Sequence, residues 1–459
     1  MNGKVVIVDE CEVREEEVSM DTTFAFPEIL SEHFVLGKHL IIASQYANWL
    51  VCDDNEYAAF RLFRDGKSIQ EVEDALMAQL QMSAEDARGA VSRLMAQVFE
   101  RDFSRDAEII TAAPLDVSLR LTSGCNLRCT ICSLHCTTVG PDECSFEQWR
   151  RFLDALKQHG ADVLTISGGE PLVNPDCVKI IVYAKKIGFR ILLLTNGTLI
   201  TNENAEVIGK NCDQIRISID GPDEATHDSI RGKGMFGKAV SALHKLVSHS
   251  DCRLTITMTP TPATLPAFRT GLRKFVDWIR QTIRSDISFE VNGMLMPGRE
   301  LPAMSREEQV DFLETVNSLC NDQLETDFAA RVAAVNVVPN RPVFDCGLKN
   351  VIPVDANGDV HLCSIFGSLC NIKEIGDSDG VDFVSRLVTK LDSLVDSIKV
   401  DRVQLCSSCD LRYFCGGGCR KENLRLRGNL NASECTDEFR QALLEKLVTL
   451  SLYTIEPLT

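Results

Sequence analysis

The sequence contains no long hydrophobic run, and basic residues are scarce in it. No stretch of about 18 consecutive apolar residues occurs, which argues against a membrane-spanning helix. The first residues, MNGKVVIVDECEVREEEV, contain no apolar segment typical of a secretory signal, so we expect a cytoplasmic protein. The 48 Lys and Arg are outnumbered by 66 Asp and Glu, and the formal net charge is −18. A surface this acidic argues against nucleic-acid and anionic-lipid partners, which require clustered Lys and Arg.

Cysteine, in contrast, is unusually frequent in this chain. The chain has 19 Cys among 459 residues. In a small secreted protein this count indicates disulfides, but this chain is long and carries no signal. Clustered cysteines in a reducing compartment indicate metal or redox chemistry instead. Apolar residues make up 44% of the chain, which is typical of a packed protein, and the length predicts about two to four domains.

Residues 1–105 are expected to form a small winged-helix-like α+β domain. The segment 39–52 alternates apolar and polar residues as a β-hairpin does. Helical patterns follow at 56–66, after Ser68 and after Ser83, where each Ser is a predicted N-cap. These helices carry mixed charge without a basic stripe, which disfavours a DNA-binding winged helix.

Residues 112–335 alternate short apolar strands with amphipathic helices. The expected strands are 115–122, 162–168, 189–197, 213–220, 252–259 and 286–293. This alternation is typical of βα units in a parallel sheet, so we predict an α/β fold, a partial (β/α)6 barrel of TIM type. Such barrels place their active sites at the C-terminal ends of the strands. A loop-rich, cysteine-rich domain at 340–440 and a helix at 436–459 complete the expected organisation.

The first chemical motif follows the first predicted barrel strand. It has the form C-x3-C-x2-C and consists of Cys125, Cys129 and Cys132. Three thiolates in one loop can hold three irons of a 4Fe-4S cluster and leave the fourth iron open. A zinc loop is the alternative, although its usual spacing is C-x2-C with a fourth ligand.

The second motif, Ser167-Gly168-Gly169-Glu170-Pro171, follows the next strand. Two glycines allow a ligand to approach the backbone closely, and the carboxylate can bind an ammonium group. Because the two motifs end neighbouring strands, we expect them to face the same cavity.

A third constellation is C-terminal. Its seven members are Cys346, Cys363, Cys406, Cys409, Cys415, Cys419 and Cys435. The middle of this set has the spacing C-x2-C-x5-C-x3-C. Zinc ribbons are the alternative reading, but seven thiolates at this spacing do not divide into tetrahedral sets.

The first two motifs resemble those of the radical S-adenosylmethionine (radical SAM) enzymes. The resemblance implies that the three cysteines of the first motif ligate a 4Fe-4S cluster whose open iron binds S-adenosylmethionine. Gly168, Gly169, Glu170 and Pro171 would then surround the amino group of that cofactor. The positions that match its further contacts are Asn196, Ser218 and Arg231, with the last two as candidates for the carboxylate. Ile131 replaces the aromatic residue that usually precedes the third cysteine, and we expect it to pack on the adenine.

The seven C-terminal cysteines resemble the SPASM extension of this family, whose members carry two auxiliary 4Fe-4S clusters. The resemblance assigns Cys346, Cys363 and Cys419 to auxiliary cluster I. It assigns Cys406, Cys409, Cys415 and Cys435 to auxiliary cluster II. Cluster I lacks a fourth ligand. Cys370, Cys320 or a non-protein group can supply it, or the open iron can bind a substrate thiolate.

Preceding these radical SAM and SPASM motifs, the N-terminal domain resembles the PqqD-like domains of enzymes that mature ribosomally synthesised peptides. Its segment Trp49–Tyr57 followed by a helix carries that resemblance. The expected partner is a precursor peptide whose leader adds as a strand to an exposed edge of the hairpin, in a groove against the third helix. An electron donor such as flavodoxin or ferredoxin is the second expected partner.

The resemblance implies a radical SAM/SPASM peptide maturase. A 5′-deoxyadenosyl radical would abstract hydrogen from the peptide, and an auxiliary cluster would then accept an electron. We predict Cys sulfur-to-carbon thioether crosslinks; carbon–carbon crosslinking, epimerisation, decarboxylation and dehydrogenation are the alternatives. A zinc-binding regulatory scaffold without catalysis is the alternative of another class. The sequence identifies no general base.

Overall fold

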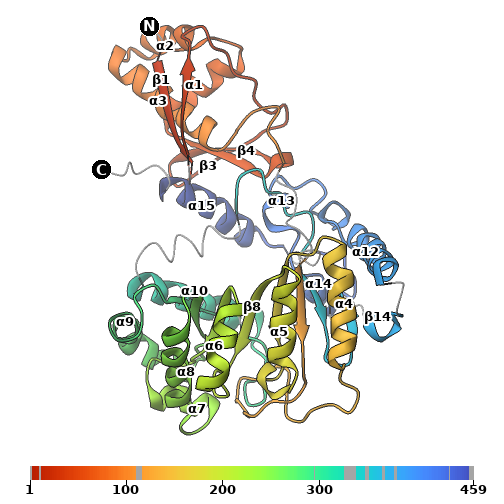
Figure 1. Ribbon diagram of the computed structural model, residues 1–459. Coiled ribbons are helices and arrows are strands. Elements are labelled where there is room, and N and C mark those ends of the chain that lie inside the picture. The colour runs from red at the N-terminus through yellow and green to blue at the C-terminus, as the bar shows by residue number, and fades with distance from the viewer. Residues whose placement is uncertain are drawn as a thin grey trace. The chain divides into compact units, whose positions relative to one another are not determined.

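The computed structural model (Figure 1) describes residues 3–9, 12–109, 116–293, 295–324, 337–346, 351–363, 367–376, 380–433 and 435–453. Contacts divide the chain into two compact units. The first comprises Met1–Ala112, Ala330–Gly347 and Val395–Thr459, and the second comprises Ala113–Ala329 and Leu348–Leu394. Within the described ranges, none of the helices has the length and apolar character needed to cross a membrane.

The first unit begins with a hairpin that the sequence patterns did not predict, β1 (Gly3–Asp9) and β2 (Glu12–Val18). A three-stranded antiparallel sheet follows: β3 (Ser31–Val35), β4 (Lys38–Ala43) and β5 (Asn48–Cys52). Three helices come next: α1 (Asp54–Arg64), α2 (Ile69–Leu80) and α3 (Ala84–Glu100). The expected hairpin and helices are confirmed, and Ser68 and Ser83 cap α2 and α3 as predicted.

The two faces of this sheet pack on different parts of the chain, because side chains alternate along each strand. One face, with Ile41, Ala43, Leu50 and Cys52, lies in a core with α1, α2 and α3. The other packs against the C-terminal segment, which contains α13 (Arg412–Cys415) and α15 (Asp437–Tyr453). The Trp49 indole nitrogen donates to the Ser451 hydroxyl at 2.8 Å. The C-terminal helix therefore completes the fold of the N-terminal sheet.

The second unit contains a nine-stranded sheet. Six parallel strands lie side by side in chain order: β6 (Asp116–Arg120), β7 (Val163–Ser167), β8 (Arg190–Thr195), β9 (Gln214–Ser218), β10 (Arg253–Met258) and β11 (Ser288–Val291). On the free side of β6 lie β12 (Val351–Val354), parallel to it, and then β13 (Asp359–His361) and β14 (Ser368–Asn371), antiparallel. The predicted α/β fold with a parallel sheet is confirmed. The sequential strand order is consistent with a partial barrel.

Helices cover one face of this sheet (Figure 1). These helices are α4 (Phe146–Gln158), α5 (Cys177–Lys186), α6 (Asn202–Asn211) and α8 (Met235–His249). The unit also contains α7 (Glu224–Arg231), α9 (Leu265–Thr282), α10 (Arg306–Gln323) and the greater part of α12 (Gly380–Ser397). The strands alternate accordingly. In β6, Val117 and Leu119 are buried, whereas Ser118 and Arg120 are half-buried. One face of β6 is thus buried and apolar, and its other face is polar.

Candidate cofactor site at the strand ends

The cysteine loop leaves the sheet just after β6 and is anchored by a carboxylate that the sequence analysis missed. Glu143 accepts hydrogen bonds from the Ser123 and Gly140 backbone N–H groups, both at 2.8 Å, and from the Thr122 hydroxyl at 3.1 Å. Burial raises the pKa of Glu143, but these donors outweigh it and the net shift is downward. The ionised carboxylate of Glu143 therefore joins Ser123 to Gly140, at the two ends of the segment that contains Cys125.

The glycine motif packs directly on the start of the cysteine loop. The Gly169 N–H donates to the Thr122 carbonyl at 2.7 Å, and the Glu170 N–H donates to the Gly124 carbonyl at 2.9 Å. A Cβ at Gly169 would lie 2.7 Å from the Gly124 carbonyl carbon and closer still to its oxygen. The sequence predicts that a ligand approaches the backbone at these glycines. At Gly169 it is the cysteine loop that makes this close approach.

Glu170 lies beneath the strand ends and is 1% exposed. Its Oε1 accepts from the Thr195 hydroxyl at 2.7 Å and from the Leu172 N–H at 3.3 Å, while its Oε2 accepts from the Asn196 N–H at 2.8 Å. Burial raises the pKa of Glu170 despite these donors. The carboxylate joins the ends of β7 and β8; a contact with a cofactor ammonium group stays a prediction.

Asn196 connects the end of β8 to the cysteine loop. Its Nδ2 donates to Asn126 Oδ1 at 3.0 Å, and Asn126 Nδ2 donates to the Thr198 hydroxyl at 2.8 Å. Asn126, which lies between the first two motif cysteines, is a second residue that the sequence analysis missed. Three consecutive strands therefore contribute to one hydrogen-bonded network at the same edge of the sheet.

Arg231 approaches the cysteine loop from α7. Its Nε lies 2.6 Å from Asp220 Oδ2, and both side chains are largely buried. Burial raises the pKa of the Cys129 thiol, and the Arg231 charge opposes that shift. The end of α7 also touches the loop, because the Thr130 N–H donates to the Ile230 carbonyl at 3.0 Å. Ser218 ends β9 and is half-buried.

His227 is a third missed residue of this region. It is 1% exposed, and its Nδ1 accepts from the Asp220 N–H at 3.1 Å. Nε2 therefore carries the proton, and it has no hydrogen-bond partner among the described residues. Burial lowers the pKa of His227 to about 4.

The three motif thiols lie within electrostatic reach of one another. Burial raises the pKa of Cys125, and the neighbouring thiols of Cys129 and Cys132 raise it further. A hydrogen bond from Cys136 lowers the pKa of Cys132 to about 5. Among the described residues, no group of three Cys, His, Asp or Glu side chains is placed to hold one metal ion. Three thiols around one loop fit a 4Fe-4S cluster with an open iron.

Four C-terminal cysteines of the first unit lie within electrostatic reach of one another. Burial raises the pKa of the Cys415 thiol to about 11, with further contributions from Cys406, Cys409 and Cys435. These four form the set predicted for auxiliary cluster II, and burial also raises the pKa of Cys406. The set therefore gathers in one unit, as a shared cluster requires.

The set predicted for auxiliary cluster I is divided between the units. Cys346 and Cys419 belong to the first unit, and the Cys419 thiol contributes to the raised pKa of Cys346, after burial. Cys363 follows β13 in the second unit. Its membership of this set, and the choice of Cys370 or Cys320 as fourth ligand, stay predictions.

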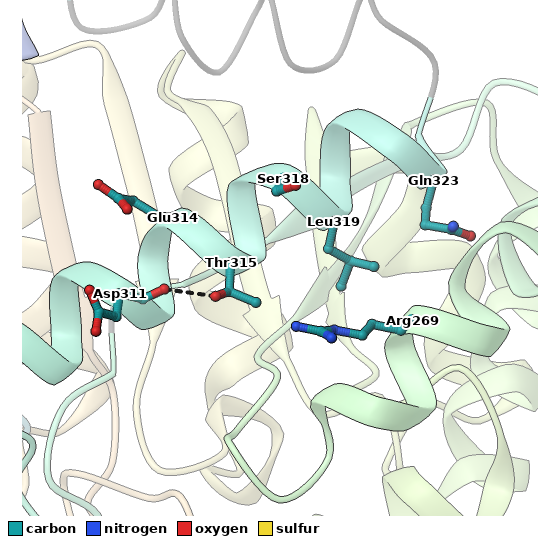
Figure 2. A pocket seen from close by; sticks show the side chains of 7 residues that line it. All are labelled: Arg269, Asp311, Glu314, Thr315, Ser318, Leu319 and Gln323. Atoms are coloured by element: carbon teal, nitrogen blue, oxygen red, sulfur yellow. Dashed lines mark hydrogen bonds between the residues drawn. The ribbon is translucent and has the colours of Figure 1, made fainter.

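A separate surface pocket of about 770 Å³ lies between α9 and α10 (Figure 2). Arg269 enters it from α9, whereas the other lining side chains, from Asp311 to Gln323, come from α10. The hydrogen bond drawn there joins the Thr315 hydroxyl to the Asp311 carbonyl at 2.8 Å. None of the predicted site residues lines this pocket.

A family model described as "Radical SAM superfamily" matches residues 119–263. The match begins in β6 and extends beyond β10, so it contains the cysteine loop, the glycine motif and the ends of the next two strands. All the contacts described above that join β7, β8 and α7 to the cysteine loop fall within it.

Curated relatives align over the same region. An AdoMet-dependent heme synthase of Methanosarcina barkeri is 36% identical over 140 residues, 30% of this chain and 40% of that protein. The mycofactocin maturase MftC of Mycobacterium ulcerans is 32% identical over 150 residues, 32% of this chain and 41% of that protein. The chain therefore spans about two fifths of the length of these relatives.

Two solved structures share the fold. Streptococcus suis SuiB bound to S-adenosylmethionine has a TM-score of 0.51 at 15% identity, over 90% of this chain and 99% of that chain. The structure titled native anSMEcpe with bound AdoMet and Cp18Cys peptide has a TM-score of 0.53 at 17% identity, over 74% and 99%. At these identities the likeness concerns the fold.

Proposed function

We propose that this chain is a radical SAM enzyme that modifies a ribosomally synthesised peptide, and the match of residues 119–263 to the radical SAM family model supports this proposal. The observation that carries the proposal is the hydrogen-bonded network joining the cysteine loop to the glycine motif and to Asn196. The mycofactocin maturase and the subtilosin biosynthesis protein AlbA among its relatives support a peptide as substrate.

In this proposal Cys125, Cys129 and Cys132 hold a 4Fe-4S cluster. When bound, the cluster and S-adenosylmethionine supply reductive cleavage of the sulfonium and abstraction of a hydrogen atom. The protein binds and orients the cofactor at the strand ends. Gly168–Pro171, Asn196 and Ser218 surround its methionine part, and Arg231 places a positive charge beside the Cys129 thiolate. Two auxiliary clusters, held by the C-terminal cysteines as predicted from the sequence, complete the proposed cofactor set.

The N-terminal sheet is the proposed binding site for an extended leader peptide. One of its two edges is already closed. On β5, the Val51 N–H donates to Gln97 Oε1 at 3.1 Å, and Gln97 Nε2 donates to the Val51 carbonyl at 2.8 Å. The Trp49 N–H donates to Asn48 Oδ1 at 2.8 Å. The third helix thus closes the β5 edge with a side-chain amide, so the groove expected there is occupied.

The opposite edge of the sheet, β3, turns backbone groups outward. Because Val51 turns its groups outward to Gln97, its partner Leu40 turns its own toward β3. Leu40 and His33 then form a hydrogen-bonded pair, and the N–H and C=O groups of Glu32 and Phe34 point away from the sheet. Among the described strands, only β4 pairs with β3. Phe34 is 67% exposed beside this edge, so an apolar peptide strand fits it.

The proposed chemical outcome is a thioether between a peptide cysteine and a carbon atom of the same peptide. A C–H bond and an S–H bond are lost and a C–S bond forms. When bound, S-adenosylmethionine would take up one hydrogen atom in forming 5′-deoxyadenosine and an auxiliary cluster would accept one electron, while one proton would go to solvent. The peptide therefore loses two hydrogen atoms per crosslink and one free thiol.

Anaerobic co-expression with a Cys-containing precursor peptide tests the proposal. We expect the peptide to lose hydrogen in pairs and its thiols to resist alkylation. Paired loss with free thiols would replace the thioether by carbon–carbon crosslinking or dehydrogenation, and unchanged mass with altered stereochemistry would indicate epimerisation. The Cys129→Ala variant should abolish every change, whereas Cys252→Ser, outside all predicted sets, should not. A peptide that is modified equally by the Cys129→Ala variant would contradict the proposal.

A further inference from the structure

Among the residues whose burial the structure describes, Arg420 is the largest charged side chain that is fully buried, with 0% exposure. It begins α14 (Arg420–Arg427), directly after Cys419. Its Nε and Nη2 donate to the Ile398 carbonyl at 2.9 and 2.7 Å. The remaining donors reach the Gly416, Gly417 and Gly418 carbonyls at 2.9, 3.0 and 2.7 Å. Five hydrogen bonds therefore join the guanidinium to neutral backbone oxygens only.

No carboxylate pairs with Arg420 in the part of the chain that the structure describes. A buried charge without an opposite charge costs several kcal/mol, and carbonyl dipoles offset only part of that cost. The neighbouring groups that can carry the opposite charge are cysteine thiols, which become thiolates when they bind iron. The guanidinium binds the Gly416 carbonyl, next to Cys415, and the Gly418 carbonyl, next to Cys419, so it lies beside one predicted ligand of each auxiliary set. The Arg420 backbone N–H also donates to the Cys346 thiol.

The surrounding loop is shaped to hold this guanidinium. Gly416, Gly417 and Gly418 all have left-handed backbone angles, with φ of 63°, 76° and 76°. A Cβ at Gly416 would lie 2.7 Å from Val343 and closer still to the Asp345 carbonyl oxygen. The loop from Cys415 to Cys419 therefore wraps the charge and packs beside Cys346. This loop carries one predicted ligand of each auxiliary set.

We propose that Arg420 is a positioning residue that supplies one buried positive charge to both auxiliary cysteine sets. It fixes the Cys415–Cys419 loop and offsets the negative charge of thiolate-bound iron. This inference rests on the proposed function, because that function requires the clusters. A positive charge at this place stabilises the reduced, more negative form of a neighbouring cluster, so its removal shifts the reduction potential downward.

The test uses the full chain with Cys125, Cys129 and Cys132 replaced by Ala, so that any iron belongs to the auxiliary sets. Iron and sulfide per chain and the midpoint potential by EPR titration are measured for Arg420→Gln and Arg420→Lys. The matched control is Arg402→Gln, which removes an exposed charge from the same unit. We expect Arg420→Gln to shift the potential downward relative to the control, and Arg420→Lys to restore most of the shift.

The outcomes separate this inference from the proposed function. If the triple-alanine parent contains no iron, the auxiliary clusters and the inference both fail. If the parent is loaded and Arg420→Gln has the control's potential, only the inference fails. If Arg420→Gln cannot be loaded, Arg420→Lys decides. A loaded Lys variant with the parent's potential supports the role of the charge, and a Lys variant without iron or with a lowered potential overturns it.

Discussion

Replacing Gly169 by Ala should break the junction between the glycine motif and the cysteine loop. The new methyl group would lie 2.7 Å from the Gly124 carbonyl carbon and 2.9 Å from the Cys136 Cβ. Two of the obstructing atoms belong to the Gly124 backbone, which cannot rotate away. Overpacking of this kind costs about 1–3 kcal/mol. The folded-to-unfolded ratio should then fall by about 5- to 160-fold unless the loop moves, which would displace Cys125.

The assay compares urea unfolding midpoints and iron per chain after anaerobic reconstitution. Gly237→Ala is the matched control, because nothing lies within 4 Å of its added Cβ and it lies in α8. That control should be neutral or stabilised by about 0.5–1 kcal/mol. Gly169→Ala should lower the midpoint, the iron content or both. A Gly169→Ala protein with the control's midpoint and full iron would refute the packing argument.

Three further predictions concern the N-terminal sheet and α7. Phe34→Pro removes an outward N–H from β3 and should weaken binding of a fluorescent leader peptide more than Phe34→Ala does; equal affinities would contradict edge pairing. Gln97→Ala leaves the Val51 groups without partners and should lower the unfolding free energy by about 1–3 kcal/mol by urea titration, whereas exposed Gln70→Ala should have no effect. The His227 pKa is about 4 when folded and 6.5 when unfolded, so the unfolded state binds more protons between these values. The free energy of unfolding should therefore fall as the pH drops from 6.5 toward 4. This fall should be smaller in His227→Asn than in the control His249→Asn, and parallel curves of unfolding free energy against pH would contradict the prediction.

The strands and helix starts were predictable because local chemistry determines them. Strands such as Leu164–Ile166 and Ile215–Ile217 alternate buried apolar with half-buried polar residues, and Ser68 and Ser83 precede their helices as N-caps. The placement of the motifs at neighbouring strand ends followed from the parallel sheet alone. For that reason the network around Glu170 lies at the edge where the sequence predicts a site.

The remaining features depend on contacts between distant residues. Trp49 bonds Ser451, 402 positions later, and no local pattern indicates that the C-terminal helix covers the N-terminal sheet. Gln97 closes the β5 edge from another element. Glu143 and Arg420 resemble ordinary surface charges in the sequence, and only their hydrogen bonds to the backbone of distant residues give them a role.

The most direct test of the central claim is the anaerobic cleavage of S-adenosylmethionine. The reconstituted chain is incubated with S-adenosylmethionine and a strong reductant, and 5′-deoxyadenosine is quantified by mass spectrometry. We predict product with the parent chain and with Cys252→Ser, and none with Cys125→Ala, Cys129→Ala or Cys132→Ala. A parent chain that is loaded with iron but forms no 5′-deoxyadenosine, or a cysteine-loop variant that forms as much as the parent, would contradict the account.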